Sequence, residues 1–398
     1  MAGLKVVELG MWVAAPAASG ILADWGADVV KIESADGDPF RWFLAFMGAD
    51  IGINPLFELD NRGKRSIVLD LATERGCELA RQLADGADVF VTNMRASALD
   101  RMGLDHASLM ARNPRLVYSL VTGYGVEGAD RDRASFDFGA FWSRAGIAAS
   151  ITPEGGDPPY QRPGMGDHTT GLGTLAGILG ALWARERSGR GQLVTTSLLR
   201  TGIYFVGSDV NLALRLGGVP LPKMRDRTAM PNPLVGYYRD RDGKWFCLLG
   251  LQGDRHWPDV ARAIGRPELA DDPGYASLAA RRERGPGVIA MLDEVFATRP
   301  LAEWGPILDA NDVWWAPVLE VHEVALDPQV RAAGGVVAVP TNEGGDVDMV
   351  ASPVDFSDTA WAPAGPSPEI GQHTEEVLLD LGYDWDGIGR LREEGAIP

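Results

Sequence analysis

The chain has 398 residues, with 55 acidic and 37 basic side chains and a formal net charge of −18 at pH 7. Its content of 45% hydrophobic and 23% charged residues is typical of a folded globular protein, and its length is sufficient for more than one domain. The strong acidity disfavours a nucleic-acid backbone or an anionic membrane surface as a partner. An anionic ligand must therefore be held by local Arg or Lys side chains.

Cysteine and histidine are sparse in this sequence. Cys77 and Cys247 are the only cysteines and lie far apart, which is typical of a reducing cytoplasm and indicates neither a disulfide nor a zinc framework. The five histidines are scattered, so we expect no metal site. The first residues lead directly into an apolar run without a basic signal region, and no segment reaches the length of a membrane span. We therefore expect a cytoplasmic protein with no membrane partner.

Short apolar runs alternate with longer amphipathic runs over the first 216 residues. This alternation predicts an α/β fold with a largely parallel sheet covered by helices on both faces. The expected strands span residues 5–9, 28–33, 66–71, 88–92, 116–121 and 193–197. The expected helices span residues 16–25, 74–83, 169–187 and 198–216.

The character of the sequence changes near Gly217. Residues 217–233 are rich in proline and are interpreted as a linker, and residues 234–324 are expected to form a smaller α+β domain that opens with a hairpin around 240–243. Residues 325–398, with two further strand-like runs and a helix at 374–381, are expected to rejoin residues 1–216 in one large domain.

Asp167 lies in a glycine-containing stretch next to an apolar helical run. An aspartate in that position is usually an N-cap that accepts a backbone N–H, and the pattern alone favours this interpretation. A reactive carboxylate is the alternative, because Gly164 and Gly166 would allow a substrate to approach and Thr169 or Thr170 could cap the helix instead. The positive end of the helix would favour the ionised carboxylate.

The opening strand–helix–strand unit raises the possibility of a dinucleotide site, with Glu33 at the end of the second strand. The G-x-G-x-x-G fingerprint is absent, and Trp12 and Pro16 would crowd the pyrophosphate path. A nicotinamide dehydrogenase is therefore disfavoured, and we expect no NAD. A G-x-S-x-G elbow, a P-loop and an H-E-x-x-H motif are also absent, which removes the main support for the common hydrolase, NTPase and zincin classes.

Two kinds of cluster remain open to more than one interpretation. The basic clusters at 61–65 and 95–101 could hold phosphates at the strand ends, although a solvated run of charges is the more common case. Nine aromatic residues could line an apolar acyl pocket, although such residues more often form a core. These are Trp12, Phe40, Trp42, Phe43, Phe46, Phe136, Phe138, Phe141 and Trp142.

Taken together, these segments resemble the family III CoA-transferases, the group that includes formyl-CoA:oxalate and carnitine CoA-transferases and is related to α-methylacyl-CoA racemase. The resemblance covers nearly the whole chain and rests on an ordered set of segments. These are Pro16 with 22–33, 37–41, Asn61 with 64–70, 88–93, 99–104, 123–125, Gly166 with Asp167, 188–192 and 371–378.

The resemblance implies transfer of CoA from an acyl-CoA donor to a carboxylic acid, with Asp167 as the covalent nucleophile and without metal or nicotinamide. It also implies a Rossmann-like large domain, an inserted smaller domain and an interlaced homodimer, for which the segment 198–232 could serve as the crossing. The implied CoA contacts are Val13, Ala14, Arg41, Leu69, Asn93, Met94, Arg95 and Arg101. The implied substrate-facing residues are Asp137, Gly166 and His168.

The chain also departs from the family pattern. Ser34 and Ala72 stand where family members often carry basic residues, so Arg41, Arg65 or Arg95 would have to contact the phosphates instead. The glycine-rich loop that shields the intermediate in formyl-CoA transferase is only partly matched by residues 250–253.

Two alternative functions stay open at this level. A racemase would need a second acid or base, but Ser135 and Phe136 precede Asp137 where relatives have a His-Asp pair, and only His168 could substitute. A non-catalytic acyl-CoA-binding protein is the third class, which the retention of Asp167 disfavours. The aromatic residues at 40–46 and 136–142 favour a bulky or apolar acid over oxalate.

Overall fold

The computed structural model describes residues 1–49, 51–223 and 226–398, which form two compact units. Each unit has its own apolar core. The expected linker 217–233 is divided between the units at residue 221, and its residues 224–225 lie outside the described residues. The first unit contains Met1–Ala149, Pro159–Leu221 and Ala333–Pro398, and the second contains Ser150–Pro158 and Pro222–Ala332.

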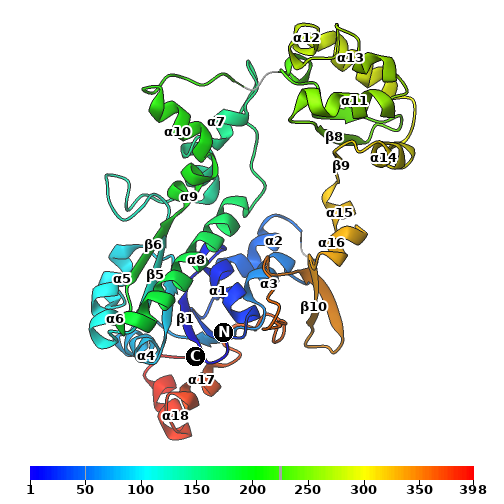
Figure 1. Ribbon diagram of the computed structural model, residues 1–398. Helices are drawn as coiled ribbons and strands as arrows, with labels where there is room; N and C mark the ends of the chain where they lie inside the picture. The colour runs from blue at the N-terminus through cyan, green and yellow to red at the C-terminus, as the bar shows by residue number, and fades with distance from the viewer. Residues whose placement is uncertain (50, 224–225) are drawn as a thin grey trace. The chain divides into compact units, whose positions relative to one another are not determined.

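A six-stranded parallel sheet is the centre of the first unit (Figure 1). Its strand order, β3-β2-β1-β4-β5-β6, is that of the doubly wound Rossmann fold, so the expected fold class is confirmed. The strand order reverses between β1 and β4, which places the usual ligand crevice of such sheets at the carboxyl ends of these strands. The strands are β1 (Lys5–Leu9), β2 (Asp28–Glu33), β3 (Arg65–Val68), β4 (Val89–Thr92), β5 (Val117–Thr122) and β6 (Leu193–Ser197).

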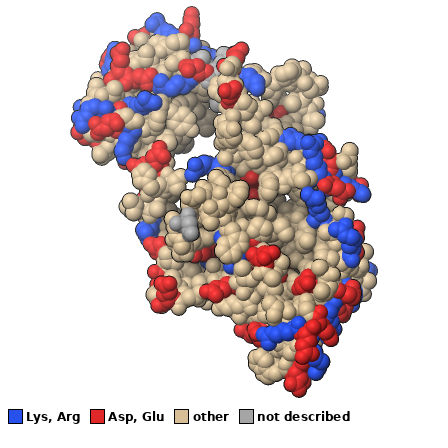
Figure 2. All heavy atoms as spheres, turned by 180° about the vertical axis from the view of Figure 1, so that it is seen from behind, with Lys and Arg blue, Asp and Glu red and all other residues tan. Residues whose placement is uncertain are grey.

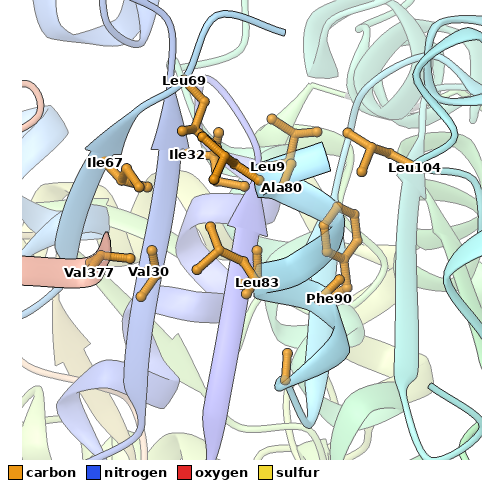
Figure 3. Packing of buried hydrophobic residues seen from close by; sticks show 14 of the residues in the cluster. Leu9, Val30, Ile32, Ile67, Leu69, Ala80, Leu83, Phe90, Leu104 and Val377 are labelled. Atoms are coloured by element: carbon orange, nitrogen blue, oxygen red, sulfur yellow. The ribbon is translucent and has the colours of Figure 1, made fainter. Parts of the chain in front are cut away.

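Helices cover both faces of this sheet, and alternate strand residues point into the two resulting layers. On one face, Val30 and Ile32 of β2 pack with Leu83 of α4 and Val377 of α17 (Figure 3). On the other face, Val29 packs with apolar residues of α1 and α8. The helices named or packed here are α1 (Ala14–Asp24), α4 (Glu74–Asp85), α5 (Ala96–Met102), α6 (His106–Arg112), α8 (Met165–Ser188), α17 (Thr374–Asp380) and α18 (Trp385–Glu393).

Two helix expectations need correction. The helix expected at 169–187 begins four residues earlier, at Met165, and the Thr169 hydroxyl donates to the Met165 carbonyl rather than capping the helix. The helix expected over 198–216 is divided in two at Val206, whose backbone leaves the helical conformation. The two parts are α9 (Leu198–Phe205) and α10 (Gly207–Arg215).

Shorter elements complete the first unit. The two strands expected between residues 334 and 356 form a separate antiparallel pair. These elements are η1 (Pro39–Trp42), α2 (Phe43–Phe46), α3 (Pro55–Asn61), the π-helix η2 (Phe138–Arg144), α7 (Ile147–Ile151), which extends into the second unit, β10 (Val336–Pro340) and β11 (Asp346–Val350).

The second unit is built on a three-stranded antiparallel sheet, and the expected hairpin forms its first two strands. Its core centres on Trp257, Phe246 and Phe296, all fully buried. The elements are η3 (Arg227–Ala229), β7 (Val235–Arg239), β8 (Trp245–Leu249), α11 (Gly253–Ala263), η4 (Pro267–Ala270), α12 (Leu278–Glu283), α13 (Gly285–Phe296), α14 (Leu301–Ala310), β9 (Trp315–Pro317), α15 (Val321–Val324) and α16 (Pro328–Ala332).

A buried charge network lies beneath the carboxyl ends of β1 and β2. The Glu8 carboxylate accepts from Lys31 at 2.7 Å and from Lys64 at 2.6 Å, and both lysines are fully enclosed. Burial alone would raise the pKa of Glu8, but the two ammonium groups lower it to about 2. The Lys31 ammonium also donates to the Gly10 carbonyl and to Asp38, so it connects the loops that follow both strands.

Replacing Glu8 with Gln should lower the free energy of unfolding of the first unit by about 3–5 kcal/mol, because two ammonium groups would stay buried with less opposing charge. Urea unfolding at pH 7 followed by circular dichroism measures this loss. Asp132→Asn is a suitable control, since Asp132 forms an exposed ion pair with Arg131, and it should change stability little. A Glu8→Gln protein as stable as the control would contradict the assignment.

Candidate active site

Asp167 is the third residue of α8, in the first turn of a 24-residue helix. The helix follows Gly164, whose φ of +81° allows the chain to turn sharply into the first turn. Asp167 is therefore not the N-cap, which was the more common interpretation of the sequence pattern. Its carboxylate makes no hydrogen bond to another residue in the described part of the chain, so it is not occupied by capping.

Close packing places the first two turns of α8 between two neighbouring elements. A Cβ atom on Gly166 would lie 2.6 Å from the ring of Phe141 in η2 and 2.8 Å from the Cβ of Asp137. A Cβ on Gly171 would lie 2.9 Å from Ala17 in α1. Real Cβ contacts are longer than these distances, so both positions require glycine.

Other carboxylates surround Asp167. Asp137 accepts the Gly166 N–H at 3.2 Å and a hydrogen bond from the Gln161 amide, while Asp60 lies at the end of α3 beside His168. Burial of Asp167, together with the charges of Asp137 and Asp60, raises the pKa of Asp167 to about 7. Burial and the neighbouring carboxylates therefore act against the helix N-terminus, and Asp167 is only partly ionised at neutral pH.

His168 is held by a carboxylate from another helix. Its Nε2 atom lies 3.1 Å from Oδ1 of Asp60, whose side chain is only 4% exposed. Burial would lower the pKa of His168, but the hydrogen bond and charge of Asp60, with the charge of Asp167, raise it. Sequence reasoning identified His168 but missed Asp60 and Gln161, because these residues are distant along the chain and carry no motif.

Several of the aromatic residues contact one another around Trp12. The ring of Trp12 contacts Phe40, Phe43 and Phe136, with a centroid distance of 5.3 Å to Phe136. Trp12 has a φ of +63°, a conformation supported by the hydrogen bond of 3.0 Å from its N–H to Asp38.

The exposed fraction of each aromatic side chain shows whether that side chain packs in a core. Packing in a core is correct for Phe40, Phe141 and Trp142, which are buried. It is wrong for Phe46, which is 85% exposed, and for Phe136, which is 60% exposed. The contacts of Phe136 with Trp12 therefore form an aromatic surface of which part faces solvent.

A pocket of about 560 Å³ lies at the carboxyl ends of β1, β2 and β3. Two of the expected CoA contacts, Leu69 and Met94, line it, together with residues 9–11, 32–39, 395 and 397–398. Within the described residues, Val13, Ala14, Asn93 and the expected arginines are not part of the lining. The Asn93 amide instead bridges the backbone N–H and carbonyl of Met11, which shapes the loop at the pocket rim.

The basic cluster at 61–65 does not behave as either interpretation predicted. Arg62 and Lys64 are buried in ion pairs with Asp24 and Glu8, so they are neither solvated nor directed at a ligand. Arg65 is paired with Asp28, Glu376 and Asp380.

The remaining arginines differ in whether they form an ion pair with a carboxylate. Arg41 donates both Nε and Nη2 to the Glu33 carboxylate, so an ion pair already occupies one of the expected phosphate contacts. Arg95 and Arg101 are exposed, and each is adjacent in sequence to a methionine that lines the pocket, Met94 and Met102. Of the expected phosphate contacts, these two are the arginines for which no carboxylate partner is found in the described chain.

Several further expectations concern whole surfaces. On the face drawn in Figure 2, acidic and basic side chains are interspersed without a continuous basic surface among the described residues. In residues 1–49, 51–223 and 226–398, no three His, Cys, Asp or Glu side chains are grouped as metal ligands, and no helix is long and apolar enough to span a membrane. Apolar side chains such as Tyr204, Phe205 and Leu214 are exposed on α9 and α10, and the homodimer stays a prediction.

Comparisons with known proteins agree with this architecture. The chain is 32% identical over 402 residues to a Clostridioides difficile (R)-2-hydroxy-4-methylpentanoate CoA-transferase, with 99% of this chain and 98% of the relative covered. It is 32% identical over 399 residues to a Clostridium sporogenes cinnamoyl-CoA:phenyllactate CoA-transferase, covering 99% and 96%. A crystal structure of a CAIB/BAIF family protein from Brucella suis superposes with a TM-score of 0.83 at 31% identity, covering 96% and 98%.

The family profile leads to the same assignment. The profile of CoA-transferase family III matches residues 1–374, which include the Rossmann sheet, the second unit and Asp167. The relatives with described activities transfer CoA and match this chain along almost its full length. The protein is therefore an enzyme that belongs to CoA-transferase family III.

Proposed function

We propose that this enzyme transfers CoA between two carboxylic acids through a covalent intermediate on Asp167. The observation that carries the proposal is the carboxylate itself: it lies in the first turn of α8, next to Gly166, and makes no hydrogen bond to another described residue. A carboxylate occupied as a helix cap would have to give up that bond before it attacked a thioester. Asp167 is already available for attack.

The reaction balances with carboxylates and thiolate alone. A carboxylate oxygen of Asp167 attacks the thioester carbonyl of the donor. The C–S bond breaks, which releases CoA as the thiolate and leaves a mixed anhydride between Asp167 and the donor acyl group. The thiolate then attacks the aspartyl carbonyl, which releases the donor acid and leaves an aspartyl-CoA thioester. The acceptor carboxylate attacks the aspartyl carbonyl of this thioester, which forms a second mixed anhydride and again releases the CoA thiolate. The thiolate then attacks the acceptor acyl carbonyl, which forms the new acyl-CoA and regenerates the Asp167 carboxylate.

The pocket at the strand ends is the proposed site of the nucleotide end of CoA. Leu69 and Met94 offer apolar surface to an adenine ring, and the exposed Arg95 and Arg101 next to the lining are the proposed phosphate partners. Val13 and Ala14 begin α1, which packs on α8 near Gly171, so the proposed pantetheine path follows this helix start toward Asp167.

An apolar or aromatic acid is the proposed acyl substrate. The aromatic surface of Trp12, Phe43 and Phe136 connects along the chain to Asp137, which holds the Gly166 N–H beside the nucleophile. Two similar enzymes are named for 2-hydroxy-4-methylpentanoate and for cinnamoyl-CoA with phenyllactate, which are branched or aromatic acids. The aromatic surface favours such an acid over oxalate.

The racemase alternative has less support from the site. A second acid or base would have to face the substrate α-carbon. Asp137 is engaged by Gly166 and Gln161, and the ring of His168 is directed at Asp60. Neither candidate is therefore available for proton abstraction without a rearrangement.

The covalent intermediate can be tested by intact mass. Wild-type protein incubated with cinnamoyl-CoA should gain the mass of a cinnamoyl or CoA moiety, and hydroxylamine should remove it. Asp167→Asn should form no adduct and should lose turnover by roughly 10⁴-fold or more, because the attacking group is absent. The matched variant Asp132→Asn, at an exposed ion pair, should behave as wild type. An adduct of equal yield on Asp167→Asn would contradict the proposal, and deuterium uptake at the α-carbon of a saturated α-methylacyl-CoA, without an adduct, would favour the racemase.

Activity should depend on the ionisation of Asp167. Since only the carboxylate attacks and its pKa is raised to about 7, the plot of kcat/KM against pH should rise about tenfold per unit below pH 7 and level off above it. Initial rates between pH 5.5 and 9, with cinnamoyl-CoA as donor, measure this limb. A profile that stays flat down to pH 5.5, as expected for an aspartate with an ordinary pKa, would show that burial and the surrounding carboxylates do not act on the nucleophile.

The proposed acyl surface predicts a selective effect of Phe136→Ala. Removing this ring should lower kcat/KM by about tenfold with an aromatic acceptor acid, because its apolar contact is lost, and change it little with acetate. Phe138→Ala is the matched control, since Phe138 is exposed two residues further on but stacks on Tyr160. Equal losses with both acceptors would place Phe136 outside the acyl site.

A further inference from the structure

We propose that His168 is a positioning residue: held by Asp60 as an imidazolium, it supplies the positive charge that keeps Asp167 partly ionised among neighbouring carboxylates. The proposal rests on the function proposed for Asp167 and adds to it the group that controls the reactive form of the nucleophile. It assigns His168 neither to proton abstraction nor to direct substrate contact.

The hydrogen bond between His168 and Asp60 joins helices α8 and α3. Asp60 is buried at the end of α3, where a Cβ on Gly20 of α1 would lie 2.6 Å from the Asp60 carbonyl oxygen. Glycine at position 20 therefore lets α3 approach α1 and brings the Asp60 carboxylate within 3.1 Å of the His168 Nε2 atom. The second carboxylate oxygen of Asp60 is buried and has no hydrogen-bond partner in the described chain, so His168 is the partner of this carboxylate.

The other side of the ring is also constrained. A Cβ on Gly164 would lie 3.2 Å from the Nδ1 atom of His168, so the glycine that starts α8 also makes room for this ring. The backbone at Gly164 adds to the effect of Asp60 in raising the pKa of His168. A neutral ring can donate from Nε2 to the Asp60 carboxylate, but only an imidazolium also balances the charge of that carboxylate. The surroundings of His168 therefore select the charged form.

The charges that face Asp167 show why a cation is needed there. They are Asp137, which precedes η2, Asp60 of α3 and His168 of α8 itself. No Lys or Arg of the described residues belongs to this group. Without charge on His168, three carboxylates would share one poorly solvated region, and each additional negative charge would disfavour ionisation of Asp167. Within the described residues, His168 is thus the cation that lowers the pKa of Asp167, and it does so through its charge.

A purely structural role for His168 makes a different prediction. If the ring only tied α3 to α8, its loss would lower activity by the same factor at every pH. If its charge supports the ionised form of Asp167, loss of that charge must move the acid limb of the pH profile and leave the high-pH plateau in place. The two roles are therefore separated by the shape of the profile.

The test compares wild type, His168→Gln and His322→Gln, a control at an exposed histidine of the second unit. The rate of adduct formation with cinnamoyl-CoA is followed by intact mass from pH 5.5 to 9. A shift of about one pH unit predicts that His168→Gln reacts about tenfold slower than wild type at pH 6 and less than twofold slower at pH 9. His322→Gln should follow wild type throughout, and full reaction of His168→Gln at pH 9 would also establish that it is folded.

A direct titration separates this inference from the proposed function. The ionisation of Asp167 is read by infrared difference spectroscopy, with Asp167→Asn used to assign its carboxyl band. An upward shift in His168→Gln supports the electrostatic role, even if wild type forms no adduct and the covalent mechanism is rejected. An unchanged midpoint, or an equal loss of rate at pH 6 and pH 9, overturns the role of His168 while adduct formation by wild type leaves the proposed function in place.

Discussion

The site depends on one buried ammonium group, that of Lys31 in the middle of β2. It donates to Glu8 on β1, to the Gly10 carbonyl at the end of β1 and to Asp38 in the loop after β2. Asp38 in turn accepts the backbone N–H groups of Trp12 and Phe40. A single desolvated cation thereby fixes both loops at the carboxyl edge of the sheet, since none of its partners can leave without exposing an unpaired buried charge.

The same electrostatics explain why basic residues near the sheet do not serve as ligand contacts. Lys31, Arg62 and Lys64 satisfy buried carboxylates in the core. The pocket at the strand ends is lined mainly by apolar and acidic residues, and the exposed Arg95 and Arg101 lie next to it in sequence. Charge that holds the fold together and charge available to an anionic ligand are thus carried by different residues.

Close packing around the proposed nucleophile disfavours the ionised carboxylate that the proposed reaction needs. Close approach of α8 to η2 and α1 requires glycine at Gly166 and Gly171 and leaves Asp167 poorly solvated. Poor solvation makes a carboxylate more reactive toward a thioester carbonyl but also harder to ionise. The proposed role of the His168–Asp60 pair is to favour the ionised form of Asp167 although this side chain is enclosed.

The sequence by itself determined the sheet and pointed to the stretch that contains the proposed nucleophile. Strong local patterns, such as the apolar runs of β1 and β2 and the glycines around Asp167, depend on neighbours in the chain and could be recognised without coordinates. The start of α8 was misplaced by four residues because its first turn is stabilised by tertiary packing at Gly166 rather than by a capping residue. Helix propensity alone carries no information on such contacts.

Only the tertiary structure decided which charges act on which. Asp60 and His168 are 108 positions apart, and Arg41 and Arg65, expected at phosphates, are instead paired with Glu33 and with three carboxylates including Asp28. A charged residue reveals in the sequence its sign but not its partner, because the Coulomb energy depends on distance and burial, which are set when the strands and helices pack.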